Sequence, residues 1–93
     1  MILSFHDRTT EAIYNGIASN RLPIEVQMVA RRKLRMLNNA RHLGDLKIPP
    51  ANRLERLKRD REEPWSIRIN KQWRICFIWD NGNAERVEIC DYH

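Results

Sequence analysis

The stretch "WSIRINKQWRICFIWDNGNAERVEIC" (residues 65–90) alternates apolar and polar side chains along three short runs. The runs cover residues 65–69, 73–79 and 85–90. They are separated by "NKQ" and "DNGN", which contain turn-forming residues. A period of two residues indicates β-strands, and short connections between consecutive strands indicate antiparallel pairing. The stretch therefore predicts an antiparallel meander in the C-terminal part of the chain.

The alternation also predicts which side chains share a face of this sheet. One face carries the large apolar residues, namely Trp65, Ile67, Ile69, Trp73, Ile75, Phe77, Trp79, Val87 and Ile89. Facing residues on paired strands must share a side, so the connections must have odd lengths, centred on Lys71 and Gly82. In this register Ile75 lies opposite Ile89.

The other face of the predicted sheet gathers arginines. The same register sets Arg68 opposite Arg74 and Arg74 opposite Cys90, with Tyr92 on the same side one step along. Two guanidinium groups in facing positions repel each other, and the protein gains nothing structural from the pair unless an anion lies near them. Both side chains could instead extend into water at little cost. We favour a groove that binds phosphate, because the arginine fork matches phosphate oxygens bidentately.

Upstream of the meander the period changes from two residues to 3.6. Residues 2–5 read as a short first strand, and Asp7 is suited to cap a helix over about residues 8–18. A second helix is expected from Pro23 to about Arg41. Residues 42–57 read as a loop, because glycine and a proline pair break the periodicity. The order of a strand, two helices and a meander predicts an α+β fold.

The second helix has two distinct faces. Its apolar stripe consists of Val26, Val29, Ala30, Leu34, Leu37 and Ala40. Arg31, Arg32 and Arg35 fall on the opposite face. These arginines form either an ordinary solvated surface or a landing surface for a polyanion, and both interpretations remain open.

Size and charge narrow the class of function. The 93 residues are expected to form one domain, residues 1–93, whose core is too small to enclose a large pocket. An active site should then be a shallow surface groove, which suits a polymer or a protein as its target. The formal net charge is +5, with 13 Arg against 4 Lys. A small basic, arginine-rich domain is a candidate for binding nucleic acid.

The two cysteines carry no recognisable metal-binding or redox motif. Cys76 and Cys90 are diagonal neighbours in the predicted register, a spacing that is long for a disulfide, so we expect small packing residues. No ligand-like spacing to histidine is present, so no metal site is expected. The N-terminal residues suggest neither a signal peptide nor a membrane span, which favours a cytoplasmic protein.

The sequence ends in three side chains that can carry or bind protons: Asp91, Tyr92 and His93. RNA contains its own nucleophile, the 2′-hydroxyl, so its cleavage needs a base, a cation beside the phosphate and an acid for the leaving oxygen. Histidine titrates near neutral pH, arginine and lysine supply charge, and no metal is required. Lys58 precedes the first strand of the meander and could approach the same groove, or it could be an ordinary exposed lysine.

These residues lie in segments that resemble a known protein family. In "IPPANRLERLKRDR" (48–61), in residues 65–79 and in the terminal "VEICDYH" (87–93) the chain resembles a HigB-type toxin of the RelE/ParE superfamily. By position, the resemblance implies a catalytic lysine at Lys58, a phosphate-binding arginine at Arg74 and a catalytic tail at Asp91, Tyr92 and His93. Arg59 adds charge beside Lys58, and Arg68 joins the site from the opposed-pair argument.

The resemblance also implies a RelE-like fold, an activity and partners. HigB-type proteins are ribosome-dependent endonucleases that cut mRNA in the ribosomal A site, without a cofactor. A HigA-type antitoxin with a helix-turn-helix domain neutralises them, and contact with operator DNA is expected only through that antitoxin. The candidate RNA contacts are Lys58 and Arg74 from the resemblance, Arg68 from the opposed pair, Arg59 from its charge beside Lys58, and Arg31, Arg32 and Arg35 from the basic face of the second helix.

Three other functions remain open at this point. A ParE-like gyrase poison would share the fold but would not need the terminal Asp91-Tyr92-His93 set. A non-catalytic growth inhibitor could act on ribosome function or assembly by binding alone. A plain nucleic-acid-binding domain would also suit the basic surface.

Overall fold

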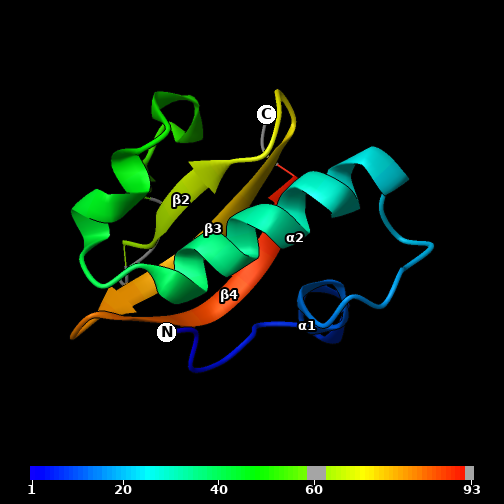
Figure 1. Cartoon of the computed structure of the whole chain (residues 1–93), viewed down its shortest axis with the longest axis horizontal. Coiled ribbons are helices and arrows are strands. Elements are labelled where there is room, and N and C mark those ends of the chain that lie inside the picture. Colours follow the sequence, from blue (N-terminus) through cyan, green and yellow to red (C-terminus); the bar gives the residue numbers. More distant parts are fainter. Residues whose placement is uncertain (59–62, 92–93) are drawn as a thin grey trace.

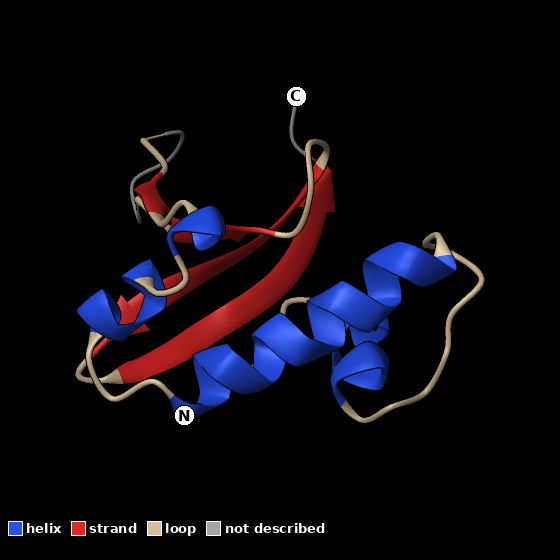
Figure 2. Cartoon of the chain, turned by 45° about the horizontal axis from the view of Figure 1, so that its top comes forward, coloured by secondary structure: helices blue, strands red, loops and turns tan. Residues whose placement is uncertain are grey.

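A four-stranded sheet covered by helices on one face forms the molecule (Figures 1 and 2). The computed structural model describes residues 1–58 and 63–91. The helical elements are α1 (Arg8–Tyr14), α2 (Ile24–Asn39) and the 3-10 helices η1 (Leu43–Lys47) and η2 (Pro50–Asn52). The strands are β1 (Glu55–Arg56), β2 (Trp65–Arg68), β3 (Trp73–Asp80) and β4 (Asn83–Asp91), antiparallel and adjacent in that order. The predicted α+β fold, with helices on a meander, is confirmed.

The helix α1 begins as predicted and ends earlier than predicted. Asp7 caps it, accepting a hydrogen bond from the Thr10 backbone N–H at 2.7 Å. The expected end near residue 18 is wrong, because Gly16 takes a left-handed φ of 83° and closes the helix. Its N–H bonds to the Ile13 carbonyl while the Ile17 N–H reaches back to Ala12, the pattern of a Schellman motif.

The helix α2 buries the predicted stripe against the sheet. Val26, Ala30, Leu34, Leu37 and the C-cap Ala40 are all buried, and the predicted member Val29 is half-buried. The stripe packs on Ile67, Ile75, Phe77 and Val87, which come from the sheet face that the alternation had assigned to the core. In the part of the chain that the structure describes, no helix is both long and apolar enough to cross a bilayer.

The N-terminal segment does not form a continuous strand. Ile2 and Phe5 each make an isolated parallel bridge, to Ala84 and Val87 on β4. The segment therefore runs along the outer edge of β4 through single hydrogen bonds, such as Leu3 N–H to the Ala84 carbonyl at 2.8 Å. The structure thus has two isolated bridges before α1, and the expected continuous strand over residues 2–5 is not formed.

The segment predicted to be a loop, residues 42–57, contains η1, η2 and β1. It is anchored by Asn52, which is fully buried and donates to the Leu46 carbonyl at 3.1 Å. The Asn52 side-chain oxygen accepts a hydrogen bond from Lys33 of α2. Burial lowers the pKa of Lys33 below its ordinary value, and the charge of Arg32 lowers it further.

The β3–β4 hairpin has the predicted register near its open end, but its turn differs from the prediction and its strand contains a bulge. Asp80 pairs with Asn83, so the turn has two residues, Asn81 and Gly82, both with positive φ. An odd-length loop centred on Gly82 is therefore wrong. A bulge beyond the turn, where Arg86 takes a φ of 52°, adds one residue to β4 and restores the register. Ile75 consequently lies opposite Ile89, as predicted.

Candidate functional site

The predicted arginine row exists at one end of the sheet. Arg68 of β2 pairs with Arg74 of β3, and Arg74 pairs with Cys90 of β4. These side chains project from the face opposite the helices, because each alternates with residues of the core such as Ile67 and Ile75. Both predicted pairings are confirmed, and the connection between β2 and β3 is centred on Lys71 as expected.

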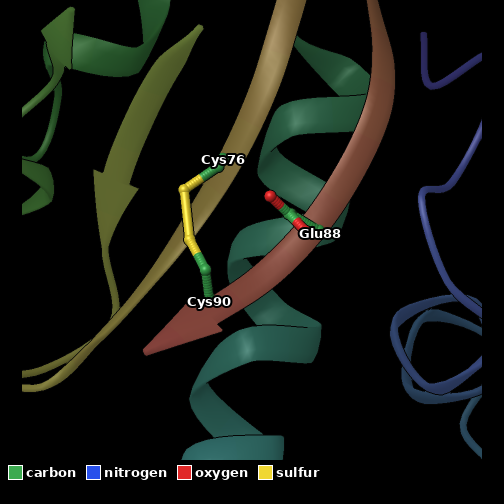
Figure 3. Close-up of side chains that lie close together, drawn as sticks. All are labelled: Cys76, Glu88 and Cys90. Carbon is green, nitrogen blue, oxygen red and sulfur yellow. A yellow bond between two sulfur atoms is a disulfide. The ribbon is translucent and has the colours of Figure 1, made fainter. Parts of the chain in front are cut away.

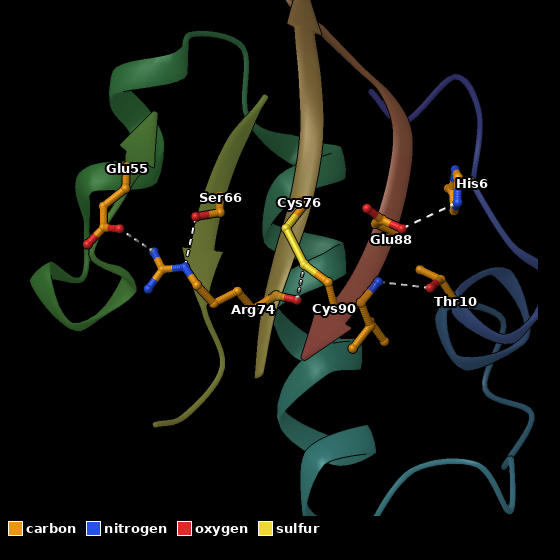
Figure 4. The surroundings of a disulfide bond; sticks show 9 residues. His6, Thr10, Glu55, Ser66, Arg74, Cys76, Glu88 and Cys90 are labelled. Carbon is orange, nitrogen blue, oxygen red and sulfur yellow. Dashed lines mark hydrogen bonds and ion pairs between the residues drawn. A yellow bond between two sulfur atoms is a disulfide. The ribbon is translucent and has the colours of Figure 1, made fainter. Parts of the chain in front are cut away.

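Arg74 is held inside the protein by several acceptors. Its side chain is only 7% exposed. Its Nε donates to Ser66 Oγ at 2.8 Å, and the Glu55 carboxylate lies 3.9 Å from its Nη2 (Figure 4). The same Nη2 donates to the Arg53 carbonyl at 2.6 Å. The guanidinium is therefore oriented across β2 toward β1, in a fixed plane.

These contacts correct the sequence-based argument that Arg68 and Arg74, as facing positive charges, need a bound anion between them. Arg68 turns toward the β2–β3 connection, where its Nε donates to the Asn70 carbonyl at 3.0 Å. Arg74 turns the other way, toward Ser66 and Glu55. Because the two side chains turn in opposite directions and each donates to an acceptor within the protein, the pair does not need a bound anion in order to fold. The opposition alone is therefore not evidence for a phosphate.

Asp91 lies at the same end of the sheet as Arg74, one residue further along the paired strands. It pairs with Trp73, one residue before Arg74, and it is exposed. The Gln72 side-chain amide donates to Asp91 Oδ2 at 3.1 Å. Strand alternation directs Asp91 toward the face of Trp73 and Ile75, and Arg74 toward the other face. The site thus lies on the rim where the two faces meet.

Lys58 comes two residues after the end of β1. In β1, Arg56 pairs with Trp65, and Trp65 in turn pairs with Phe77. Since β1 is antiparallel to β2, the chain after Arg56 leads away from Arg68. Lys58 is exposed, and its catalytic role stays a prediction.

The remaining predicted residues divide into two groups. Arg59, Tyr92 and His93 lie outside the described residues, so their roles stay predictions. Arg31, Arg32 and Arg35 are exposed on α2. Because α2 covers the sheet face opposite to Arg74, these three arginines belong to a separate surface (Figure 4).

The expectation of unlinked cysteines is wrong. Cys76 and Cys90 form a disulfide between β3 and β4, with their Cα atoms 6.7 Å apart (Figure 3). They are diagonal neighbours as predicted, but this diagonal is shorter than the general value and falls at the upper end of the range for disulfides. Glu88 lies beside them, with its carboxylate and both sulfurs within 4.8 Å of one another. In this oxidised state neither thiol is available as a metal ligand.

Three residues around Arg74 were not identified from the sequence. Ser66 could have been found, because the predicted register places it diagonal to Arg74 on the same face. Glu55 could not, because β1 consists of two exposed polar residues with no alternation to reveal it. Arg53 could not either, because it lies in the irregular segment between η2 and β1 and contacts Arg74 through its backbone carbonyl.

Comparison with known proteins gives the family. A family model described as "RelE-like toxin of type II toxin-antitoxin system HigB" matches residues 3–93. "Toxin HigB-1" of Vibrio cholerae serotype O1 is 40% identical over 85 residues, 90% of each chain. "Endoribonuclease HigB" of Proteus vulgaris is 30% identical over 93 residues, all of both chains. The chain therefore belongs to the HigB family of RelE-like toxins of type II toxin–antitoxin systems.

Proposed function

We propose that this protein is a toxin that acts as a ribosome-dependent mRNA endoribonuclease. It cuts messages in the ribosomal A site and thereby inhibits translation in the cytoplasm. The end-to-end match to a relative named "Endoribonuclease HigB" carries this proposal. The neutralising partner is an antitoxin of the HigA type with a helix-turn-helix domain, and operator DNA is contacted only through it.

The proposed reaction uses the substrate's own 2′-hydroxyl as nucleophile. A base removes its proton, the oxygen attacks the adjacent phosphorus, and the bond to the 5′ oxygen breaks as that oxygen is protonated. Asp91, Tyr92 and His93 are the proposed proton-transfer groups. Asp91 is the last residue of β4, and Tyr92 and His93 come directly after it in the sequence. Side chains supply every proton and charge in this scheme, so no cofactor is needed.

Arg74 is the proposed phosphate ligand. Ser66 and the Arg53 carbonyl orient its guanidinium, which reduces the rearrangement needed when charge builds on the phosphate. A phosphate at this site competes with Glu55, which is half exposed and can move away. Because the Arg74 side chain is largely covered, neighbouring side chains must shift when RNA binds.

The outer contacts complete the proposed RNA surface. Arg68 lies in the row of Arg74 and can contact a neighbouring phosphate. Lys58 is the proposed catalytic lysine, as the resemblance implies, and Arg59 beside it in the sequence adds positive charge. A shallow rim of this kind leaves room for the ribosome to position the substrate, so the free protein should be a poor nuclease.

The test is the ribosome dependence of cleavage. A defined message is incubated with the untagged protein, with and without ribosomes, and its 5′ ends are mapped. Cuts that appear only with ribosomes, and at the codon in the A site, support the proposal. A preparation that arrests growth but produces no cuts contradicts it, and inhibition of DNA gyrase in the same preparation would identify a ParE-like toxin instead.

A further inference from the structure

The disulfide lies in a group of side chains of the metal-ligand type, on the sheet face that carries Arg74 (Figure 3). Cys76 of β3 pairs directly with Glu88 of β4, and Cys90 follows Glu88 two positions later on the same face. The two sulfurs and a carboxylate oxygen all lie within 4.8 Å of one another. Bonds of about 2.0–2.3 Å to a tetrahedral zinc ion would separate such atoms by about 3–4 Å. The hairpin backbone therefore holds the three side chains at the spacing of a metal site.

The group is partly shielded from water, and its charges suit a cation. Cys76 is only 2% exposed, and Glu88 and Cys90 are half-buried. Two thiolates beside a carboxylate would repel one another in such surroundings unless a cation lay between them. A divalent ion neutralises two of these three negative charges, and Arg74 supplies a positive charge on the same face. The group thus matches a doubly charged metal ion.

His6 contacts the carboxylate of this group from its other side (Figure 4). The His6 Nε2 lies 3.5 Å from Glu88 Oε2, and the His6 backbone N–H donates to the Val87 carbonyl at 2.9 Å. The backbone of His6 is therefore fixed at the edge of β4, where the imidazole can orient the carboxylate. A partner of this kind behind a ligating carboxylate is the usual outer shell of a metal site.

Reduction of the disulfide makes both sulfurs available as ligands. A dithiol reductant transfers two electrons to the Cys76–Cys90 bond, each cysteine sulfur takes up one proton, and the reductant closes into its own disulfide. A divalent cation then displaces the two thiol protons, which pass to water, and forms two metal–sulfur bonds. The step from disulfide to metal site therefore needs only a dithiol and the ion.

We propose that Cys76, Cys90 and Glu88 bind a divalent cation of the zinc class when the disulfide is reduced. Two sulfur ligands and one carboxylate select a thiophilic ion such as Zn²⁺ over Mg²⁺ or Ca²⁺, which prefer oxygen ligands. A water molecule completes the tetrahedron, and His6 positions Glu88. Spacing along the sequence did not indicate this site, because strand pairing brings the ligands together.

The ion and the disulfide are alternative links between the same two strands. Cys90 directly precedes Asp91, the last residue of β4. In the oxidised protein the disulfide joins this end of β4 to β3, and in the reduced protein the metal ion does so. The end of the strand is thus held under both redox conditions. The ion acts as a structural link and takes no part in the proposed cleavage reaction.

The test measures metal binding by the reduced, full-length protein. The chain is reduced with a dithiol, separated from it without oxygen, and titrated with Zn²⁺ against a chromogenic chelator and with Co²⁺ as a spectroscopic probe. We expect one ion per chain and an absorption band from sulfur-to-cobalt charge transfer, and neither with oxidised protein. His6→Ala should weaken zinc binding by about tenfold, and Glu88→Gln by more. Glu85→Gln, a control on the same strand but outside the group, should bind like wild type.

Thermal unfolding gives an independent measurement of the link. Zn²⁺ should raise the unfolding temperature of reduced wild type, because it binds the folded chain, and should leave oxidised wild type and the Cys76→Ser/Cys90→Ser variant unchanged. Absence of the sulfur-to-cobalt band in folded, reduced wild type overturns the proposal without the use of any variant. Zinc binding of equal strength in the folded double variant also overturns it, because the ion then lies elsewhere on the chain. Cleavage is not measured in these experiments, so their result is independent of the proposed function.

Discussion

At the scale of single residues, Ser66 determines how Arg74 is presented. Ser66 is fully buried, and its hydroxyl is the acceptor for Arg74 Nε. Arginine has no way to lose its charge at this position, so a missing acceptor leaves a buried charged donor unpaired. The serine is therefore a positioning residue for the proposed phosphate ligand.

Replacing Ser66 with alanine tests this role. We expect Ser66→Ala to lower the free energy of unfolding by about 1–3 kcal/mol, the cost of an unsatisfied buried group. Cleavage should fall, because the guanidinium of Arg74 loses one of the groups that orient it. Urea unfolding and a single-turnover cleavage assay measure the two effects. Wild-type values in both would show that the Ser66–Arg74 contact is unimportant.

Asp45 gives a prediction about pH. Its carboxylate accepts hydrogen bonds from the backbone N–H groups of His42 and Arg41, and these bonds lower the pKa of Asp45 below the ordinary value of 3.8. A lowered carboxyl pKa contributes stability above the unfolded value, and this contribution is lost as the pH falls through the folded value. Wild type should therefore lose stability below about pH 4 more steeply than Asp45→Asn. Parallel urea titrations from pH 6 to pH 2.5 compare the slopes, and identical slopes would rule out this linkage.

At the scale of elements, the disulfide joins the strands that carry the site. Cys76 and Cys90 are separated by 14 positions in the sequence, and they connect β3, which bears Arg74, with the end of β4. The bond restricts the unfolded chain as well as the folded hairpin. We expect reduction to lower the free energy of unfolding by about 2–4 kcal/mol.

The matched control is the Cys76→Ser/Cys90→Ser double variant. Thermal unfolding of wild type should shift to a lower temperature when a reductant is added, and that of the double variant should not respond. Equal unfolding temperatures of oxidised and reduced wild type would contradict a stabilising disulfide.

The elements also show what the sequence could predict. The pairing of Arg68, Arg74 and Cys90 followed from alternation together with the positions of the two turns, because a slip of one residue would move the large apolar residues to the other face. The combination of turn and bulge that produces this register in the β3–β4 hairpin could not be predicted. It requires a bulge at Arg86, a residue type with no preference for a positive φ, and this bulge offsets the two-residue turn at Gly82.

The surroundings of the site were less predictable than its register. Glu55 reaches Arg74 from a strand of two exposed residues, which produces no periodic signal. Whether Cys76 and Cys90 can form a disulfide depends on a few tenths of an ångström in the distance between their Cα atoms. Strand twist determines this diagonal distance, and sequence spacing does not.

At the scale of the whole molecule, Met1 and Asp91, the first and last described residues, lie at opposite ends of β4. The Met1 carbonyl accepts a hydrogen bond from Ala84, close to the Asn81–Gly82 turn, whereas Asp91 pairs with Trp73. A tag on the C-terminus therefore extends from the proposed catalytic tail, and a tag on the N-terminus does not.

This separation predicts different effects of tags. We expect a C-terminal fusion to reduce cleavage by about 100-fold, the typical contribution of a general acid or base that it displaces. An N-terminal fusion of the same length should cleave like the untagged protein. Growth arrest in cells that express each form provides a second measurement, and equal toxicity of the two fusions would remove the tail from the mechanism.

The measurement that tests the central claim most directly compares cleavage by three untagged proteins on ribosomes programmed with one message. Wild type, Arg74→Lys and a form that lacks His93 are compared by single-turnover mapping of 5′ ends, and each is first verified as folded by thermal unfolding. The account predicts A-site cuts by wild type and a loss of about 100-fold or more in both variants, because one lacks the oriented fork and the other the terminal imidazole. A-site cleavage at the wild-type rate by both folded variants would falsify the assignment of the active site to this end of the sheet.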